Sequence, residues 1–161
     1  ALDAAHDEVR HARVIGAIAR EHGVEPAVAR VEALPVRDLE AIALENALEG
    51  CVRETYGAVV GAYQAARAQD EMLRFAMHGI ALDEARHAAL SHDLHAWLMP
   101  RISEAARARI AQAQQLMIER LREQQDDAAV GALAGLPRPE VAHAMLDALE
   151  RELWHAPAQA V

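Results

Sequence analysis

Two nearly identical pentapeptides, DEVRH at residues 7–11 and DEARH at residues 83–87, constrain how this 161-residue chain can fold. Each carries a Glu and a His three residues apart, a spacing that places both side chains on one face of a helix. In both segments that face is the apolar one, which a folded helix buries. Because an ionised carboxylate without a partner is very costly to bury, we expect one shared partner to compensate the acids of both helices.

The neighbouring residues define the buried faces. Glu8 and His11 share theirs with small and aliphatic residues of the first helix: Ala4, Ala12, Ile15, Ile18 and Ala19. Glu84 and His87 lie in the middle of a longer stripe: Leu73, Ala76, Met77, Ile80, Ser91, Leu94, His95 and Leu98. Both pairs are therefore predicted to point into the interior of a helical protein.

A third acid, Glu54, interrupts a stripe of small residues between the two pentapeptides. In a regular helix the stripe comprises Ala43, Asn46, Ala47, Gly50, Gly57, Ala58, Gly61 and Ala65. Small side chains let helices approach closely, so Glu54 is expected to point into the gap between them. Glu49 lies off this stripe, and Glu54 is therefore the preferred candidate.

The rest of the chain also predicts helices. Ala, Leu, Arg and Glu dominate, and no alternating strand pattern occurs. Capping residues, glycines and prolines predict helices at about residues 2–22 (stopping at Gly23), 38–68, 70–98 and 103–125, and a last one from about Pro139 after a break around Gly135. The predicted fold class is all-α.

Charge and cysteine content exclude several function classes. The net charge of −9 argues against a nucleic-acid surface, and there is no basic stripe for a membrane. A single cysteine, Cys51, favours a reducing cytoplasm, and no apolar run is long enough to span a bilayer. The chain starts at Ala1 without Met and reads as helix by Asp3, which we interpret as loss of preceding residues.

A metal site between the helices is the favoured interpretation of the buried acids and imidazoles. Metal-bound histidine commonly donates its other ring N–H to a carboxylate, and Asp7 and Asp83 are placed to reach the histidine of the opposite helix. Arg10 and Arg86 project to the far sides and are expected to pair with surface acids. The candidate metal ligands are Glu8, His11, Glu54, Glu84 and His87.

An alternative without metal remains open. A single Glu-x-x-His arises readily by chance, whereas the repeated pentapeptide on two apolar stripes is far more specific. A buried network in which Glu8 and Glu84 pair with the histidines could nevertheless be kept for structural specificity alone.

The order Glu-x-x-His, Glu, Glu-x-x-His resembles the ferritin-like di-iron carboxylate superfamily, in the second, third and fourth helices of its antiparallel bundle. EGCVRETYGA at 49–58 and DEARHAAL at 83–90 are also similar to bacterial ferritin-like domain proteins. The resemblance implies a bundle core at residues 1–100, with residues 101–161 as a C-terminal helical extension packed on it. It also implies that each histidine caps one ion and that a glutamate bridges two.

One part of that family pattern has no counterpart here. The family's first helix, with its own Glu, is missing, and the later acids Glu104, Glu119, Glu150 and Glu152 project away from the apolar stripes. There are three explanations for the missing carboxylate. It could come from a helix preceding residue 1 or from another chain, as in a homodimer, or the site could have one ligand fewer.

Carboxylate and imidazole ligands suit iron or manganese better than metals that prefer thiolates. The resemblance implies a di-iron centre that reacts with dioxygen or peroxide, as an oxidase or oxygenase or as an iron-oxidising, iron-handling protein. A metal-free helical interaction module is the third hypothesis. The pattern assigns no catalytic residue and names no organic substrate.

Overall fold

The computed structural model describes residues 2–28, 30, 35–124 and 128–154, and the regular structure among them is helical, with no strand. The all-α prediction is confirmed for this part of the chain. None of the helices described there is long and apolar enough to cross a membrane.

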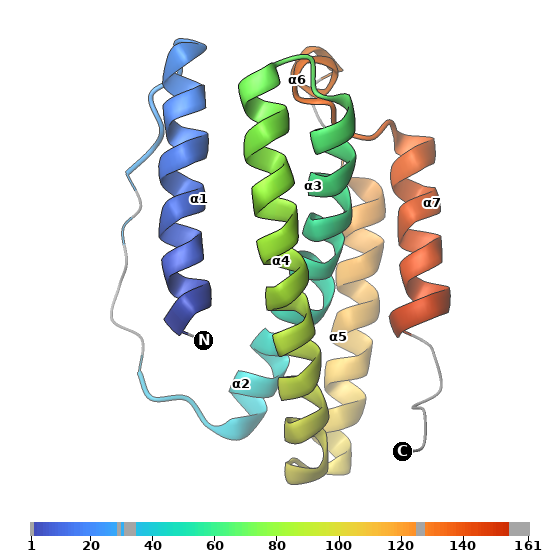
Figure 1. Cartoon of the computed structure of the whole chain (residues 1–161). Coiled ribbons are helices and arrows are strands. Elements are labelled where there is room, and N and C mark those ends of the chain that lie inside the picture. Colours follow the sequence, from blue (N-terminus) through green and yellow to red (C-terminus); the bar gives the residue numbers. More distant parts are fainter. Residues whose placement is uncertain (1, 29, 31–34, 125–127, 155–161) are drawn as a thin grey trace.

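The long helices lie side by side, and α1 runs in the same direction as the next long helix, which contains α3, whereas α4 runs antiparallel to both (Figure 1). α1 packs against α4, and α4 packs against the continuous helix that contains α3. α5 and α7 cover the other side of that continuous helix. The elements are α1 (Leu2–Glu21), α2 (Leu39–Glu45), η1 (Asn46–Glu54), α3 (Thr55–Arg67), α4 (Glu71–Leu98), η2 (Met99–Arg101), α5 (Glu104–Glu123), α6 (Ala128–Ala134), α7 (Pro139–Leu149) and η3 (Glu150–Trp154).

Capping side chains explain where the helices begin. Asp38, Asp70 and Ser103 each accept a hydrogen bond from the backbone N–H three residues on, at 2.8, 2.8 and 3.1 Å. α1 ends just before Gly23, whose φ of 79° is the left-handed conformation that glycine favours. These boundaries are confirmed, although the predicted end of the fourth helix at residue 125 lies outside the described residues.

The short helix α6 was not predicted. It precedes Gly135, whose φ of 69° ends the helix and turns the chain. A Cβ at Gly135 would lie 2.6 Å from the Cα of Ala68, so this turn packs directly on the end of α3. A backbone hydrogen bond also joins α6 to the segment after α3, because the N–H of Gln69 donates to the carbonyl of Leu133 at 3.0 Å.

The predicted helix at 38–68 is continuous, but its middle, η1, is a π-helix of nine residues. Each i→i+5 turn holds more residues than an α-turn, so the faces before and after η1 do not follow the regular projection. Ala43, Ala47 and Gly50 are buried as predicted, whereas Gly57 is exposed. The predicted small-residue stripe was therefore wrong at Gly57, although Gly61 further along is buried against Ala81 of α4.

Two features keep η1 in place. Gly50 lies so close to α4 that an added Cβ would be 2.5 Å from the Cβ of Ser91 and closer still to its hydroxyl oxygen. On the other side, the indole N–H of Trp154 in η3 donates to the carbonyl of Cys51 at 2.8 Å. The C-terminal helices thus contact the segment that ends at Glu54. The division of the chain at residue 100 stays a prediction.

One cluster of buried apolar residues lies at one end of the bundle. It joins α2, η1, the end of α4, the residue after η2 and α5 through Ala43, Ala47, Leu98, Ile102, Ala106 and Ile110. None of these residues belongs to either pentapeptide, so the candidate site lies apart from the best-packed apolar cluster.

Gly50→Ala should destabilise the protein, although alanine normally favours helices. The added methyl group collides with Ser91, and overpacking of this kind costs about 1–3 kcal/mol in the free energy of unfolding, measured with urea. Gly57→Ala is the matched control, because no neighbouring atom lies within 4 Å of its added Cβ. It should be neutral or stabilise the protein by up to about 1 kcal/mol. Equal effects would contradict the close packing of η1 on α4.

Candidate metal centre

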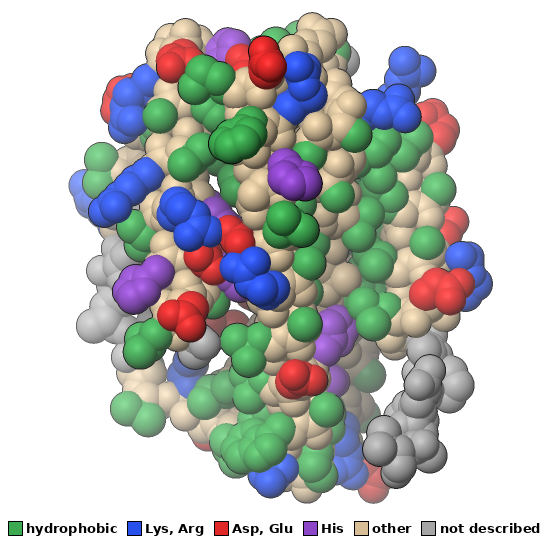
Figure 2. Space-filling view, in the orientation of Figure 1, with side chains coloured by type: hydrophobic (Ala, Val, Ile, Leu, Met, Phe, Trp, Pro, Cys, Tyr) green, Lys and Arg blue, Asp and Glu red, His purple; other side chains and the backbone are tan. Residues whose placement is uncertain are grey.

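The antiparallel packing of α1 and α4 brings the two pentapeptides opposite each other (Figure 1). Because the same residue types run in opposite directions, the contacts are related by an approximate two-fold axis. Figure 2 shows acidic and basic side chains gathered over the seam between these two helices. The repeat in the sequence thus becomes one symmetric cluster in the fold.

Two glutamates and two histidines form the inner part of the cluster. Nδ1 of His11 lies 3.7 Å from Oε1 of Glu8 on its own helix and 3.2 Å from Oε1 of Glu84 across the seam. Nδ1 of His87 lies 3.7 Å from Oε2 of Glu84 and 3.2 Å from Oε1 of Glu8. Each imidazole therefore faces both carboxylates.

Nδ1 of His11 is buried and makes no hydrogen bond, although a carboxylate oxygen of Glu84 lies 3.2 Å away. Two atoms that bind the same metal ion approach each other without hydrogen-bond geometry. With metal–ligand bonds of about 2.1 Å, such atoms lie about 3 Å apart. One ligand atom each from Glu8, His11 and Glu84 lies within 4.8 Å of the others. The donor atoms therefore fit a bound metal ion.

The aspartates lie on the outer side of the imidazoles. Nε2 of His11 is 3.0 Å from Oδ2 of Asp83, and Nε2 of His87 is 3.2 Å from Oδ2 of Asp7. An ionised carboxylate only accepts, so each Nε2 carries a proton, and Nδ1 is the ring nitrogen directed toward the glutamates. The expected reach to the opposite helix is confirmed, whereas orientation of a metal-bound histidine stays a prediction.

The arginines of the pentapeptides were misplaced by the sequence argument. Arg10 pairs with Asp7 at 2.7 Å and with Asp83, and Arg86 pairs with Asp83 at 2.6 Å and with Asp7 at 3.4 Å. They contact the aspartates of the cluster and not merely surface acids. Their long side chains extend back over the seam from the helix flanks. The signal that could have found them is their presence in both pentapeptides, one turn after the Asp.

The electrostatics separate an outer and an inner part. Burial alone would raise the pKa of Asp83, but hydrogen bonds from His11, Arg86 and Arg10 outweigh it and lower that pKa to about 2. The hydrogen bond from His87, with the ion pair to Arg10, lowers the pKa of Asp7. In contrast, burial and the neighbouring Glu8 carboxylate raise the pKa of Glu84. The inner carboxylates therefore lack positive charge that the outer ones have.

Glu54, at the end of η1, faces the same region without joining the inner cluster. The Ser91 hydroxyl donates to its Oε2 at 3.3 Å. Burial raises the pKa of Glu54, and the hydrogen bond from Ser91 partly offsets that effect. Glu54 thus contacts α4 through Ser91. Its assignment as a metal ligand stays a prediction, as do those of Glu8, His11, Glu84 and His87.

Glu8 and Glu84 differ in access to solvent. The side chain of Glu8 is 57% exposed, whereas that of Glu84 is 16% exposed. The predicted burial of Glu8 was therefore wrong. The cluster is thus closed on the side of α4 and open beside Glu8. A small molecule could approach from the open side.

Comparison of the chain with protein-family models, with curated proteins and with solved structures finds no significant match. The functional interpretation therefore depends on the geometry of these residues.

Asp83→Asn should destabilise the metal-free chain by about 2 kcal/mol at pH 6, because buried hydrogen bonds to a charged carboxylate are lost. Folding lowers the pKa of Asp83 from 3.8 to about 2, so its contribution is present above the unfolded-state pKa and is lost as the pH falls through about 2. Urea unfolding in the presence of a chelator should show the difference from the parent chain shrinking between pH 5 and pH 2.

Asp93→Asn removes the same charge from an exposed position of α4 and is the matched control. It should change the free energy of unfolding by less than about 0.5 kcal/mol. A pH-independent penalty for Asp83→Asn would contradict the assigned role of the carboxylate charge.

Proposed function

We propose that this chain is a non-haem metal protein of ferritin-like di-iron carboxylate type, with its metal centre between α1 and α4. One observation carries the proposal: the buried Nδ1 of His11 has no hydrogen bond and faces the Glu84 carboxylate. An unsatisfied buried nitrogen is costly, and a cation placed between it and the carboxylates would remove that cost. The symmetric second histidine, His87, supports the same interpretation.

The residues of the cluster have distinct tasks in this proposal. His11 and His87 each present Nδ1 to a metal ion, and Glu8 and Glu84 supply oxygens that both histidines face. Glu54 contributes a further carboxylate from η1. Asp7 and Asp83 hold the proton on Nε2 of the histidines and so set which nitrogen is free.

Nitrogen and oxygen donors without thiolate favour iron or manganese. Ferrous ions held by these residues would supply electrons for the reduction of dioxygen or peroxide. The partly exposed Glu8 side gives such a small oxidant access, while the buried face beside α4 limits access by water. We therefore propose an oxygen-dependent oxidase, oxygenase or iron-oxidising activity.

Metal binding is the first test. The parent chain, equilibrated anaerobically with Fe²⁺ and then dialysed, should retain iron by elemental analysis. Glu84→Gln and His11→Ala should each lower the affinity for Fe²⁺ at least tenfold, because each removes one donor atom from the cluster. Glu123→Gln, at an exposed position on α5, is the matched control and should bind like the parent chain. A parent chain that retains no iron or manganese would contradict the proposal.

The metal-free alternative predicts different behaviour. If the cluster is only an ion-pair network, Glu84→Ala should leave thermal stability unchanged or raised, and Fe²⁺ or a chelator should not alter it. In a metal protein, Fe²⁺ should raise the melting temperature of the parent chain and not that of the variant, because the ligand binds the folded state alone.

Oxygen consumption is the second test. The parent chain loaded with Fe²⁺ should consume dioxygen faster than free Fe²⁺ in the same buffer, as followed with an oxygen electrode, and Glu84→Gln should abolish the difference. Ferric iron released or stored after repeated additions would favour iron handling. Iron that remains bound and is re-reduced would favour an oxidase or oxygenase. No acceleration over free Fe²⁺ would contradict an oxidative function.

A further inference from the structure

Four charged side chains outside the inner cluster form a closed arrangement, and the proposed function gives no task to its two arginines. Arg10 contacts both Asp7 and Asp83, and Arg86 contacts the same two aspartates. We name these four residues the Arg–Asp ring. Each of α1 and α4 supplies one arginine and one aspartate, so the four side chains carry no net charge, and two ion pairs join the helices.

Each oxygen of Asp7 and Asp83 has at least one hydrogen-bond partner among the arginines and histidines. In Asp7, Oδ1 accepts from Arg10, while Oδ2 accepts from His87 and lies near Arg86. In Asp83, Oδ1 accepts from Arg86, while Oδ2 accepts from His11 and Arg10. Neither carboxylate can rotate without breaking a charged hydrogen bond. The oxygen that faces each histidine is therefore fixed.

We propose that Arg10 and Arg86 are positioning residues for the metal centre, acting through the aspartates to keep Nδ1 of both histidines directed at the metal. This inference rests on the proposed function. A histidine ring can turn over and exchange its two nitrogens unless a partner fixes one of them. Asp7 and Asp83 are those partners. The hydrogen bonds from the arginines keep each carboxylate from rotating away from its histidine.

Arginine suits this task better than lysine. Its planar guanidinium offers several donors in a rigid fork and can bridge two carboxylates at once, whereas the lysine ammonium is a point charge on a flexible stem. The arginine side chains are 54% and 63% exposed, while the aspartates are 13% and 11% exposed. The guanidinium groups thus cover the aspartates on their solvent side.

Exposed ion pairs by themselves contribute little to stability. A purely structural role for the ring would therefore change unfolding slightly and leave the properties of a bound ion alone. A positioning role changes the affinity for metal and the ligand field of the bound ion. Because each arginine holds both aspartates, either one alone should preserve most of the arrangement, and the two effects should be strongly non-additive.

The experiment uses Co²⁺ as the probe, because its visible absorption reports ligand geometry. Arg10→Gln and Arg86→Gln should each weaken Co²⁺ binding by less than about threefold, whereas the double variant should weaken it roughly tenfold, the lower end of the effect of removing partners of metal ligands. At saturating Co²⁺, the absorption band of the double variant should differ from that of the parent. Arg10→Lys with Arg86→Lys keeps both charges and should give an intermediate affinity.

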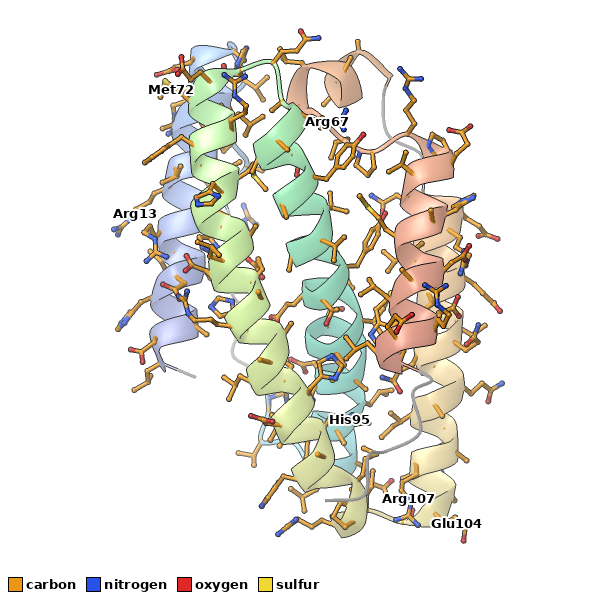
Figure 3. The ribbon with its side chains drawn as sticks, turned by 45° about the vertical axis from the view of Figure 1, so that its right-hand side comes forward. Arg13, Arg67, Met72, His95, Glu104 and Arg107 are labelled. Atoms are coloured by element: carbon orange, nitrogen blue, oxygen red, sulfur yellow. The ribbon has the colours of Figure 1, made fainter. Side chains whose placement is uncertain are left out.

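Arg13→Gln is the matched control, because Arg13 is an exposed residue of α1 that extends away from the bundle (Figure 3). It should leave the affinity and the spectrum unchanged. If the Gln double variant does not fold by circular dichroism, the Lys double variant carries the test through its altered band at saturation.

Three results would contradict the inference or its basis. Parent-like affinity in both double variants would overturn it. Weaker binding with a parent-like spectrum at saturation would show that the ring only holds the helices together, which also overturns it. Failure of the parent chain to bind either Co²⁺ or Fe²⁺ would instead contradict the metal centre itself.

Discussion

The contact between α1 and α4 across the repeated pentapeptides is the interaction on which the site depends. One exposed carboxylate, one largely buried carboxylate and two buried imidazoles meet there, apart from the apolar cluster at one end of the bundle. The outer aspartates are paired with arginines, whereas the inner glutamates face Nδ1 of the two histidines and have no such partner. That difference supports the proposal of a cation in the cluster.

The π-helix η1 gives the opposite wall of the site its shape. Gly50 allows the helix to approach Ser91 on α4, and Ser91 in turn donates to Glu54. The contact of Trp154 with the carbonyl of Cys51 supports η1 from the far side. Packing on both sides therefore determines where Glu54 points. A regular helix with the same residues would have turned the positions that follow it to a different face.

Much of the fold could be predicted because its signals are local. Asp38, Asp70 and Ser103 cap helices as their positions indicate, and Gly23 ends α1. The π-helix and α6 escaped prediction because they depend on contacts with distant segments. Gly57 was predicted to be buried because ideal helical geometry was assumed throughout the helix at 38–68. The π-helix in its middle departs from that geometry, and Gly57 is exposed.

The sequence by itself determined which residues share a helix face, because helical periodicity places Glu8 with His11 and Glu84 with His87 regardless of the partner. It also indicated that each Asp would reach the opposite histidine. Only the tertiary structure decided that Arg10 and Arg86 join the same cluster, because long side chains can bend from a helix flank over a seam that helical projection does not contain. The open side beside Glu8 likewise follows from how the helices are placed, a property that no single helix encodes.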